Sequence, residues 1–167
     1  MVLAAYISGK TFIMEYRIEY DKVMAIVEEE VSREAAQAAS ADGVALYDGM
    51  RMVSRDEDKK RRMMSEVLAV IKAQCNRFLK RAEVAEGDGE PISFVFELDI
   101  TPRRRAGKEE SLQTLFRSLS VNLVLNRFFA SKNLTDLAAK YDSFALADIQ
   151  MMTKLLYEKL PPVYPQI

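Results

Sequence analysis

Two segments of ten residues alternate apolar and polar side chains, and this pattern constrains the fold more than any other feature. Residues 11–20 (TFIMEYRIEY) place apolar side chains on one face, namely Phe12, Met14, Tyr16, Ile18 and Tyr20. Residues 92–101 (ISFVFELDIT) repeat the pattern with Ile92, Phe94, Phe96, Leu98 and Ile100. A period of two predicts half-buried strands. We expect the two strands to pair antiparallel, with their apolar faces against helices and their charged faces in water. Glu97 and Asp99 share the polar face of the second strand and are interpreted as a solubilising edge.

The rest of the chain has the period of amphipathic helices. The first predicted helix runs from Asp21 to about Ala39, and the Ser40–Gly43 cluster is expected to end it. Residues 44–53 are interpreted as an ordered connection. A second helix is predicted to start at a capping box formed by Ser54 and Glu57 and to end near Ala82. The acidic run at residues 56–58 fits the start of this helix better than a metal site. The basic stretch at residues 59–62 is interpreted as a solvated face and not as a binding site.

Two further helices are predicted in the second half of the chain, over residues 108–131 and 135–160. The first of them is apolar almost all round, so it is expected to be the central element or to meet another subunit. Its Asn122 and Asn126 lie one turn apart and favour hydrogen bonds between helices over catalysis. The last helix is expected to be capped by Thr135 and to stop before Pro161 and Pro162.

The amino-acid composition limits the catalytic and metal-binding chemistry that the chain can support. The 167 residues are 49% hydrophobic and 29% charged, with a formal net charge of −1, which is typical of a globular domain. The absence of histidine excludes Ser-His-Asp catalysis and every His-ligated metal site. The single cysteine, Cys75, excludes an intramolecular disulfide, and its place on a core-facing helical position predicts an inert thiol. Carboxylate, lysine and tyrosine chemistry remain open, but no motif in the sequence favours them. We predict no catalytic residue, no metal and no cofactor.

Two features near the N-terminus are interpreted neither as a nucleotide-binding motif nor as a targeting signal. Ser8–Thr11 (SGKT) resembles the end of a phosphate-binding loop, but Ala4 replaces the required first glycine and a strand follows instead of a helix. The start of the chain, MVLAAYISGK, lacks a basic segment and is too short to span a bilayer. No other uncharged apolar stretch is long enough to do so, and we expect neither secretion by a standard signal nor a membrane span.

The densest basic cluster is formed by Arg103, Arg104, Arg105 and Lys108, on the predicted loop before the third helix. Three interpretations stay open for it. The loop is simply solvated, it contacts an acidic surface of a neighbouring protein, or it contacts nucleic acid phosphates. The near-zero net charge gives no support to nucleic acid binding by the chain as a whole.

The segment LPPVYPQI contains a Pro-Pro-x-Tyr pattern of the type that WW domains bind. Pro161 and Pro162 also stop the preceding helix, so Val163 and Tyr164 can begin an extended arm with one aromatic anchor. The apolar head, residues 1–10, is a second such arm. Both arms are predicted to contact neighbouring copies, or else to fold back on their own core.

The order of segments resembles small proteins of bacteriophages and prophages of Bacteroides-type gut bacteria. The resemblance covers residues 20–162, and its motifs are a tyrosine-aspartate pair, an acidic helix start and a hydrophobic helix followed by a final helix. The matching positions are Tyr47, Asp48, Asp56–Asp58, Asn126–Phe129, Tyr141 and Leu156–Pro162. It implies a virion structural protein, such as a neck, head–tail connector or tail-completion component in a ring around the phage axis. A WW-bearing partner is not expected in that setting.

These observations predict one α+β domain, mostly helical, over residues 1–167. About four helices pack together and on a small two-stranded sheet, with an N-terminal arm at residues 1–10 and a proline-rich C-terminal arm at residues 161–167. The expected function is non-enzymatic assembly, with other copies and neighbouring virion proteins as partners and no membrane. The alternative is a small nucleic-acid-binding or regulatory module that uses the Arg103–Arg105 loop. The first hypothesis predicts a homo-oligomer, such as a ring, whose number of subunits stays open.

Overall fold

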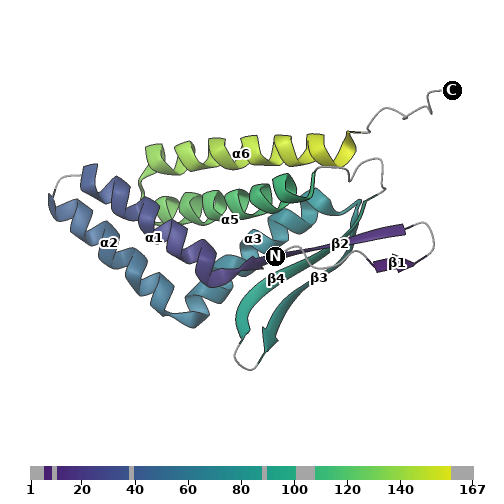
Figure 1. Ribbon diagram of the computed structural model, residues 1–167. Coiled ribbons are helices and arrows are strands. Elements are labelled where there is room, and N and C mark those ends of the chain that lie inside the picture. The colour runs from purple at the N-terminus through teal and green to yellow at the C-terminus, as the bar shows by residue number, and fades with distance from the viewer. Residues whose placement is uncertain (1–5, 9–10, 38–39, 88–89, 101–107, 159–167) are drawn as a thin grey trace.

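The computed structural model describes residues 6–8, 11–37, 40–87, 90–100 and 108–158 of the chain. The described residues form five helices and four strands (Figure 1). In chain order, they are β1 (Tyr6–Ser8), β2 (Thr11–Glu19), α1 (Tyr20–Gln37), α2 (Ser40–Arg55), α3 (Glu57–Cys75), β3 (Leu79–Gly87), β4 (Glu90–Asp99), α5 (Glu109–Ser131) and α6 (Thr135–Tyr157). The mostly helical α+β class predicted from the sequence is confirmed, with one more helix and two more strands than expected.

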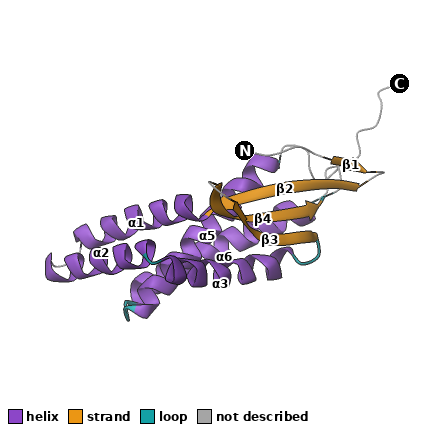
Figure 2. Ribbon diagram, turned by 90° about the horizontal axis from the view of Figure 1, so that it is seen from below, coloured by secondary structure: helices purple, strands orange, loops and turns teal. Residues whose placement is uncertain are grey.

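The four strands form one antiparallel sheet in the order β1-β2-β4-β3. The predicted antiparallel pairing of β2 and β4 is confirmed, with Tyr16 opposite Phe96 and Ile13 opposite Asp99. Figure 2 shows the sheet at one end of an elongated molecule and the helices extending from it. The SGKT segment connects two paired strands, β1 and β2, which is not the strand-to-helix context of a phosphate-binding loop.

One face of the sheet is apolar and packs on α5. The Phe116 ring of α5 stacks on Phe96 at 5.4 Å between centroids and lies 5.2 Å from Tyr16. All three side chains are fully buried, so aromatic contacts join the sheet to the helical layer.

The other face of the sheet carries ion pairs. Arg81 of β3 reaches Glu97 of β4 at 3.4 Å, and Lys80 reaches Asp99 at 3.2 Å. We expected Glu97 and Asp99 to form a solubilising sheet edge. That interpretation is wrong, because β4 is an inner strand of the sheet and not an edge strand. The two carboxylates form cross-strand ion pairs instead.

Helix α5 is the central element of the helical layer, as its apolar sequence predicted. It contacts α1, α3, α6 and β2. Its buried residues occupy most of its circumference, namely Leu112, Phe116, Leu119, Ser120, Val121, Leu123, Val124, Leu125, Phe128 and Phe129. Its observed start is within one residue of the prediction, and its end agrees with it.

Residues 44–53 are helical, and the prediction of a connection there is wrong. They belong to α2, which begins at Ser40 and packs along α1. Gly43 was expected to help end the first helix, but it lies inside α2 at a close approach between helices. A Cβ atom added at Gly43 would overlap the carbonyl oxygen of Ala35. The glycine therefore serves packing and not termination.

The predicted second helix is too long at its C-terminal end. α3 stops at Cys75, and residues 79–87 form β3, which pairs with β4. Phe78 ends the helical segment by donating its N–H to the Cys75 carbonyl at 2.8 Å. Pairing with an inner strand outweighs the helical period of this segment, because sheet contacts override local propensity.

Two predicted helix caps and one predicted helix end also differ from the structure. The cap of α3 is Asp56, whose carboxylate accepts from the Lys59 N–H at 3.1 Å, whereas Ser54 lies within α2. Thr135 is the first residue of α6 and not its cap, a position that Leu134 takes without a side-chain bond. α6 ends at Tyr157, because Glu158 has extended backbone angles, so the helix stops short of the predicted Leu160.

Candidate functional site

Most of the residues predicted to form an interface lie outside the described part of the chain. These are Arg103, Arg104, Arg105, Pro161, Pro162, Val163 and Tyr164, as well as most of the N-terminal arm. Lys108 is described, and it is buried instead of exposed on a basic surface. Its ammonium donates to the carbonyl oxygens of Leu155 at 3.2 Å and Glu158 at 3.1 Å, and lies 3.4 Å from the Glu158 carboxylate.

Lys108 therefore joins the start of α5 to the end of α6. The last carbonyl groups of a helix have no partner within the helix, and the positive charge of Lys108 suits the helix C-terminus. Residues 101–107 precede Lys108 directly, and residues 159–167 follow Glu158 directly. The arginine loop and the proline-rich tail consequently depart from one anchored point.

The start of β2 lies at this same end of the molecule, at the right of Figure 1. Ile13 pairs with Asp99, and the Asp99 N–H donates to the Phe78 carbonyl at 2.8 Å. The Phe78 ring in turn lies 5.0 Å from the ring of Tyr157 at the end of α6. Contacts thus connect the points where the arginine loop and the proline-rich tail leave the described fold with the start of β2, on which Tyr6–Ser8 of the predicted N-terminal arm pair as β1. We call this region the anchored end.

A second feature is a groove of about 510 Å³ between α1, α5 and α6, here called the α1–α5–α6 groove. Its volume is in the range of typical ligand pockets, but it is open along one side. It is lined by both apolar and charged side chains, namely Ile26, Glu30, Arg33, Thr114, Arg117, Ser118, Val121, Asn122, Leu125, Lys140, Tyr141 and Phe144.

A carboxylate of α6 organises the α5 side of the groove. Asp148 accepts from the Ser118 hydroxyl at 2.7 Å and from the Asn122 amide at 2.8 Å. One turn further along α5, the Asn126 amide donates to the Ala138 carbonyl at 2.9 Å. The prediction that the two asparagines join neighbouring helices is confirmed. These bonds fix the side chains of α5 and α6 relative to each other.

A second network joins α1 to α6. Glu34 is only 9% exposed, and its carboxylate accepts from the Tyr141 hydroxyl at 3.0 Å and from the Lys140 ammonium. Burial acts to raise the pKa of Glu34, but the bonds from Lys140 and Tyr141 outweigh it and hold the pKa below its usual value. Burial, followed by the nearby Glu34 carboxylate, raises the pKa of the Tyr141 hydroxyl.

The pKa values of other titratable groups are also shifted away from neutral pH. Burial raises the pKa of the Cys75 thiol to about 12, and the sulfur lies 4.0 Å from the Met152 sulfur in the core. The prediction of a buried cysteine is confirmed. Burial also raises the pKa of Tyr20 to about 12, although the Arg61 charge opposes it. The ion pairs of Lys60 with Asp21 and Glu57 outweigh burial and raise the lysine pKa.

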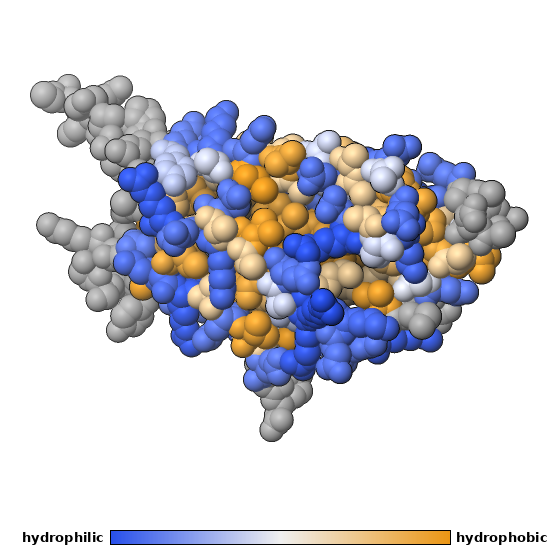
Figure 3. All heavy atoms as spheres, turned by 180° about the vertical axis from the view of Figure 1, so that it is seen from behind, coloured by the Kyte–Doolittle hydropathy of each residue, from blue (hydrophilic) through white to orange (hydrophobic). Residues whose placement is uncertain are grey.

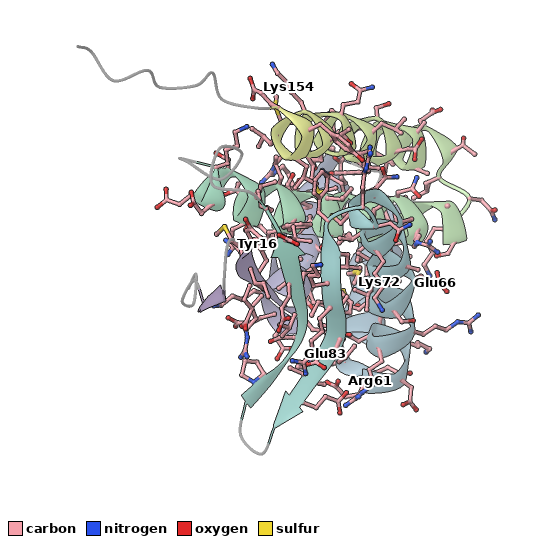
Figure 4. The ribbon with its side chains drawn as sticks, turned by 90° about the vertical axis from the view of Figure 1, so that its right-hand side faces the viewer. Tyr16, Arg61, Glu66, Lys72, Glu83 and Lys154 are labelled. Carbon is pink, nitrogen blue, oxygen red and sulfur yellow. The ribbon has the colours of Figure 1, made fainter. Side chains whose placement is uncertain are left out.

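The basic stretch at residues 59–62 is only partly a solvated face. Lys60 is 6% exposed and reaches Asp21 at 2.8 Å, contrary to the sequence prediction, while its neighbours in the stretch are exposed. Figure 4 shows Arg61 near the start of α3, beside the β3–β4 hairpin, where it pairs with Glu86. These contacts tie α3 to α1 and to the sheet.

Apolar side chains are also exposed on α6. Phe144 is 48%, Leu146 51%, Met151 50% and Tyr157 41% exposed. Figure 3 shows apolar atoms among charged ones on the face opposite to that of Figure 1. The groove was not predicted from the sequence, although Phe144, which lines it, falls outside the helical stripe of Leu137, Tyr141, Ala145, Ile149, Met152 and Leu156. Apolar residues off the core stripe of a helix indicate a second contact surface.

Within the described residues, no group of three or more cysteine and carboxylate side chains is placed to hold a metal ion. None of the described helices combines the length and apolarity needed to cross a bilayer. Comparisons of the chain with protein-family models, with curated proteins and with solved structures found no match.

Proposed function

We propose that this chain is a non-enzymatic structural protein of a bacteriophage virion, which acts through subunit interfaces as a neck, head–tail connector or tail-completion component. The observation that carries the proposal is the anchored end. Lys108 holds the departure points of the arginine loop and the proline-rich tail together, and both segments were predicted to contact neighbours. Segments that leave a rigid body from one point can engage one adjacent subunit together, which raises their combined affinity.

The titration behaviour of the described residues supports a role without bond chemistry. Catalytic acids and bases work best with a pKa near the operating pH. Here Glu34 is shifted downward, whereas Tyr20, Lys60, Cys75 and Tyr141 are shifted upward. Each shift stabilises the form that the group already has at neutral pH. These residues are therefore suited to holding helices together and not to transferring protons.

In this mechanism the folded body sets the spacing between subunits, and the two ends of the chain bind neighbouring subunits as extended segments. Proline-rich segments are extended before they bind, so they lose little conformational entropy on docking. Tyr164 would supply an aromatic anchor on the neighbouring subunit, and Arg103–Arg105 would meet carboxylates there. A head-to-tail contact of this kind produces rings when its rotation closes.

Deletion of residues 163–167 tests the proposal. We expect the truncated chain to keep the circular dichroism spectrum and melting temperature of the full chain, since it retains every described element. Its self-association, measured by light scattering over a wide concentration range, should weaken. A matched control is Val163→Ala, which keeps the length of the tail and its Tyr164 anchor.

Two outcomes would contradict the proposal. A full chain that stays monomeric at all concentrations, both alone and with neighbouring virion proteins, would remove the assembly function. Salt-sensitive DNA binding that disappears when Arg103, Arg104 and Arg105 are changed to alanine would favour the nucleic-acid alternative instead.

A further inference from the structure

We propose that the α1–α5–α6 groove of one chain binds the proline-rich tail, residues 159–167, of a neighbouring copy. This inference rests on the proposed function and deepens it, because it names the surface on which the tail docks. The tail and the groove are different parts of the chain, so each copy donates one contact and receives another. A head-to-tail contact of this kind joins copies into a ring when its rotation closes.

The groove has an apolar floor and an aromatic rim. Val121 and Leu125 of α5 are buried, Ile26 of α1 is partly buried, and all three line the groove. Phe144 of α6 is 48% exposed, and its ring meets the Tyr141 ring edge-on at 5.8 Å between centroids. A concave surface is filled by a segment that projects, and extended proline-rich segments dock into grooves lined by aromatic side chains.

The unpaired charge of the groove is a hydrogen-bond donor. Of the other charged side chains that line the groove, Glu30 pairs with Arg33 at 3.1 Å, and the Lys140 ammonium is bound by the Glu34 carboxylate. Arg117 is exposed, and within the described part of the chain no carboxylate lies within ion-pair distance of it. A guanidinium donates hydrogen bonds and accepts none. The groove therefore favours an occupant that offers acceptors beside an apolar surface.

The tail offers such acceptors. Three of its residues are prolines, which have no N–H, and an extended proline-rich backbone makes no hydrogen bonds within itself. Its carbonyl oxygens are therefore open to Arg117, while Tyr164 supplies a ring that packs against Phe144. The one charged side chain of the tail, Lys159, precedes Tyr164 by about five residues, or up to about 17 Å, which allows its charge to stay outside the groove.

The path of the chain directs the tail to a neighbour's groove and not to its own. Glu158 follows the last residue of α6, at the right of Figure 1, and Lys108 holds its carbonyl oxygen at 3.1 Å. Phe144 lies about 14 residues earlier in the helix, or about 21 Å back along its axis. Tyr164 follows Glu158 by about six residues, which reach about 20 Å when fully extended. A turn that reverses the chain takes about four residues, so Tyr164 cannot reach the Phe144 ring of its own chain.

The groove is also fixed before it is occupied. The Asp148 carboxylate accepts from the Ser118 hydroxyl and the Asn122 amide, and the Glu34 carboxylate accepts from the Tyr141 hydroxyl. Side chains that are already held lose less conformational entropy when a surface is buried. A proline-rich segment is likewise extended before it binds. Both sides of the contact therefore lose little freedom when the tail docks.

Two variants of the full chain test the contact. Tyr164→Ala removes the ring of the tail, and Phe144→Ser removes the ring at the rim of the groove. Each is expected to weaken self-association by roughly tenfold or more, as measured by analytical ultracentrifugation. A mixture of the two keeps one intact contact, between the tail of the Phe144→Ser chain and the groove of the Tyr164→Ala chain. We expect this mixture to form one-to-one dimers that do not grow further, at concentrations where each variant alone stays monomeric.

Leu146→Ser is the matched control for the groove. Leu146 is also an exposed apolar residue of α6, at 51%, but it does not line the groove. Its change should leave self-association as in the wild type. Arg117→Ala is a second groove variant that alters no buried side chain, and it should weaken the contact by about tenfold through the loss of a charged donor. Circular dichroism spectra like that of the wild type would show that each variant is folded.

The outcomes separate this inference from the function on which it rests. If wild-type chains associate only with virion neighbours, or if Phe144→Ser and Arg117→Ala chains associate as well as the wild type, the groove does not bind the tail and the assembly function stands. If Tyr164→Ala and Phe144→Ser both weaken association but their mixture forms no dimer, the tail of one chain does not enter the groove of another. If wild-type chains associate neither with one another nor with virion neighbours, both proposals fail, and a lower melting temperature of Tyr164→Ala would then show that the tail packs on its own chain.

Discussion

At the residue scale, Glu34 shows how a nearly buried charge is used to hold two helices together. Its carboxylate joins α1 to α6 through Tyr141 and Lys140. Removing the carboxylate leaves the buried Tyr141 hydroxyl without this acceptor, which costs more than the bond itself contributes. The carboxylate is therefore best understood as a structural clamp that holds Lys140 and Tyr141, two residues that line the groove.

We predict that Glu34→Gln lowers the free energy of unfolding by about 1–2 kcal/mol near neutral pH, because a neutral amide accepts more weakly from Lys140. The pKa of Glu34 is lower in the folded state, so its contribution is present above the unfolded pKa of about 4.3 and is lost as the pH falls through the folded pKa. Urea unfolding at a series of pH values should show the difference between variant and wild type shrinking under acid.

The control for this prediction is Glu29→Gln. Glu29 is 74% exposed, and its ion-pair partner among the described residues is Arg33, at 3.8 Å, so its removal should change stability little at any pH. A Glu34→Gln difference that stays constant down to strongly acidic pH would contradict the clamp, since the effect would then not depend on the carboxylate charge.

At the scale of elements, the junction between α5 and α6 depends on Lys108. We predict that Lys108→Met destabilises the fold by about 2 kcal/mol, because the apolar stem is kept while the donor to two carbonyl groups is lost. Amide hydrogen exchange should become faster at the end of α6. Lys154→Met, on the exposed face of the same last turn, should have almost no effect.

Elements with a strong period were predictable from sequence, and those defined by long-range contacts were not. The alternation of β2 and β4 and the apolar faces of α1, α5 and α6 gave their positions within a few residues. α2 was missed because Gly43 is typical of a helix end, yet here it allows α1 to approach. β3 was missed because Phe78, Leu79 and Ala82 continue a helical stripe that pairing with β4 overrides.

The groove could be predicted only in part for a related reason. The roles of Asn122 and Asn126 follow from their spacing on an apolar helix, whereas their partners Asp148 and Ala138 depend on how α6 returns along α5. Lys108 was grouped with three arginines because it is their neighbour in sequence. Its burial depends on the end of α6, some 50 residues further along the chain.

At the scale of the whole molecule, α5 is the hub, because it meets three helices and the sheet. Helix α2 packs on α1 and α3, and among its described side chains the buried hydrophobic ones are Leu46 and Met50, whereas α5 buries nine. Regions with few buried apolar contacts open at lower free energy than the core. The amides of α2 should therefore exchange before those of α5 in the native state.

Two core variants test this order. Phe116→Ala removes the ring that joins α5 to Phe96 and Tyr16, so we predict a loss of about 3–5 kcal/mol shared by all slowly exchanging amides. Met50→Ala removes a fully buried side chain of α2, and its loss of about 2–4 kcal/mol should fall most strongly on α2. Exchange measured by mass spectrometry on both variants locates each effect. The proposed order would be wrong if α5 opened before α2, or if Met50→Ala accelerated exchange equally in all elements. In that case α1 and α2 would belong to the same cooperative unit as the core, and the whole helical layer, not α5 alone, would be the hub.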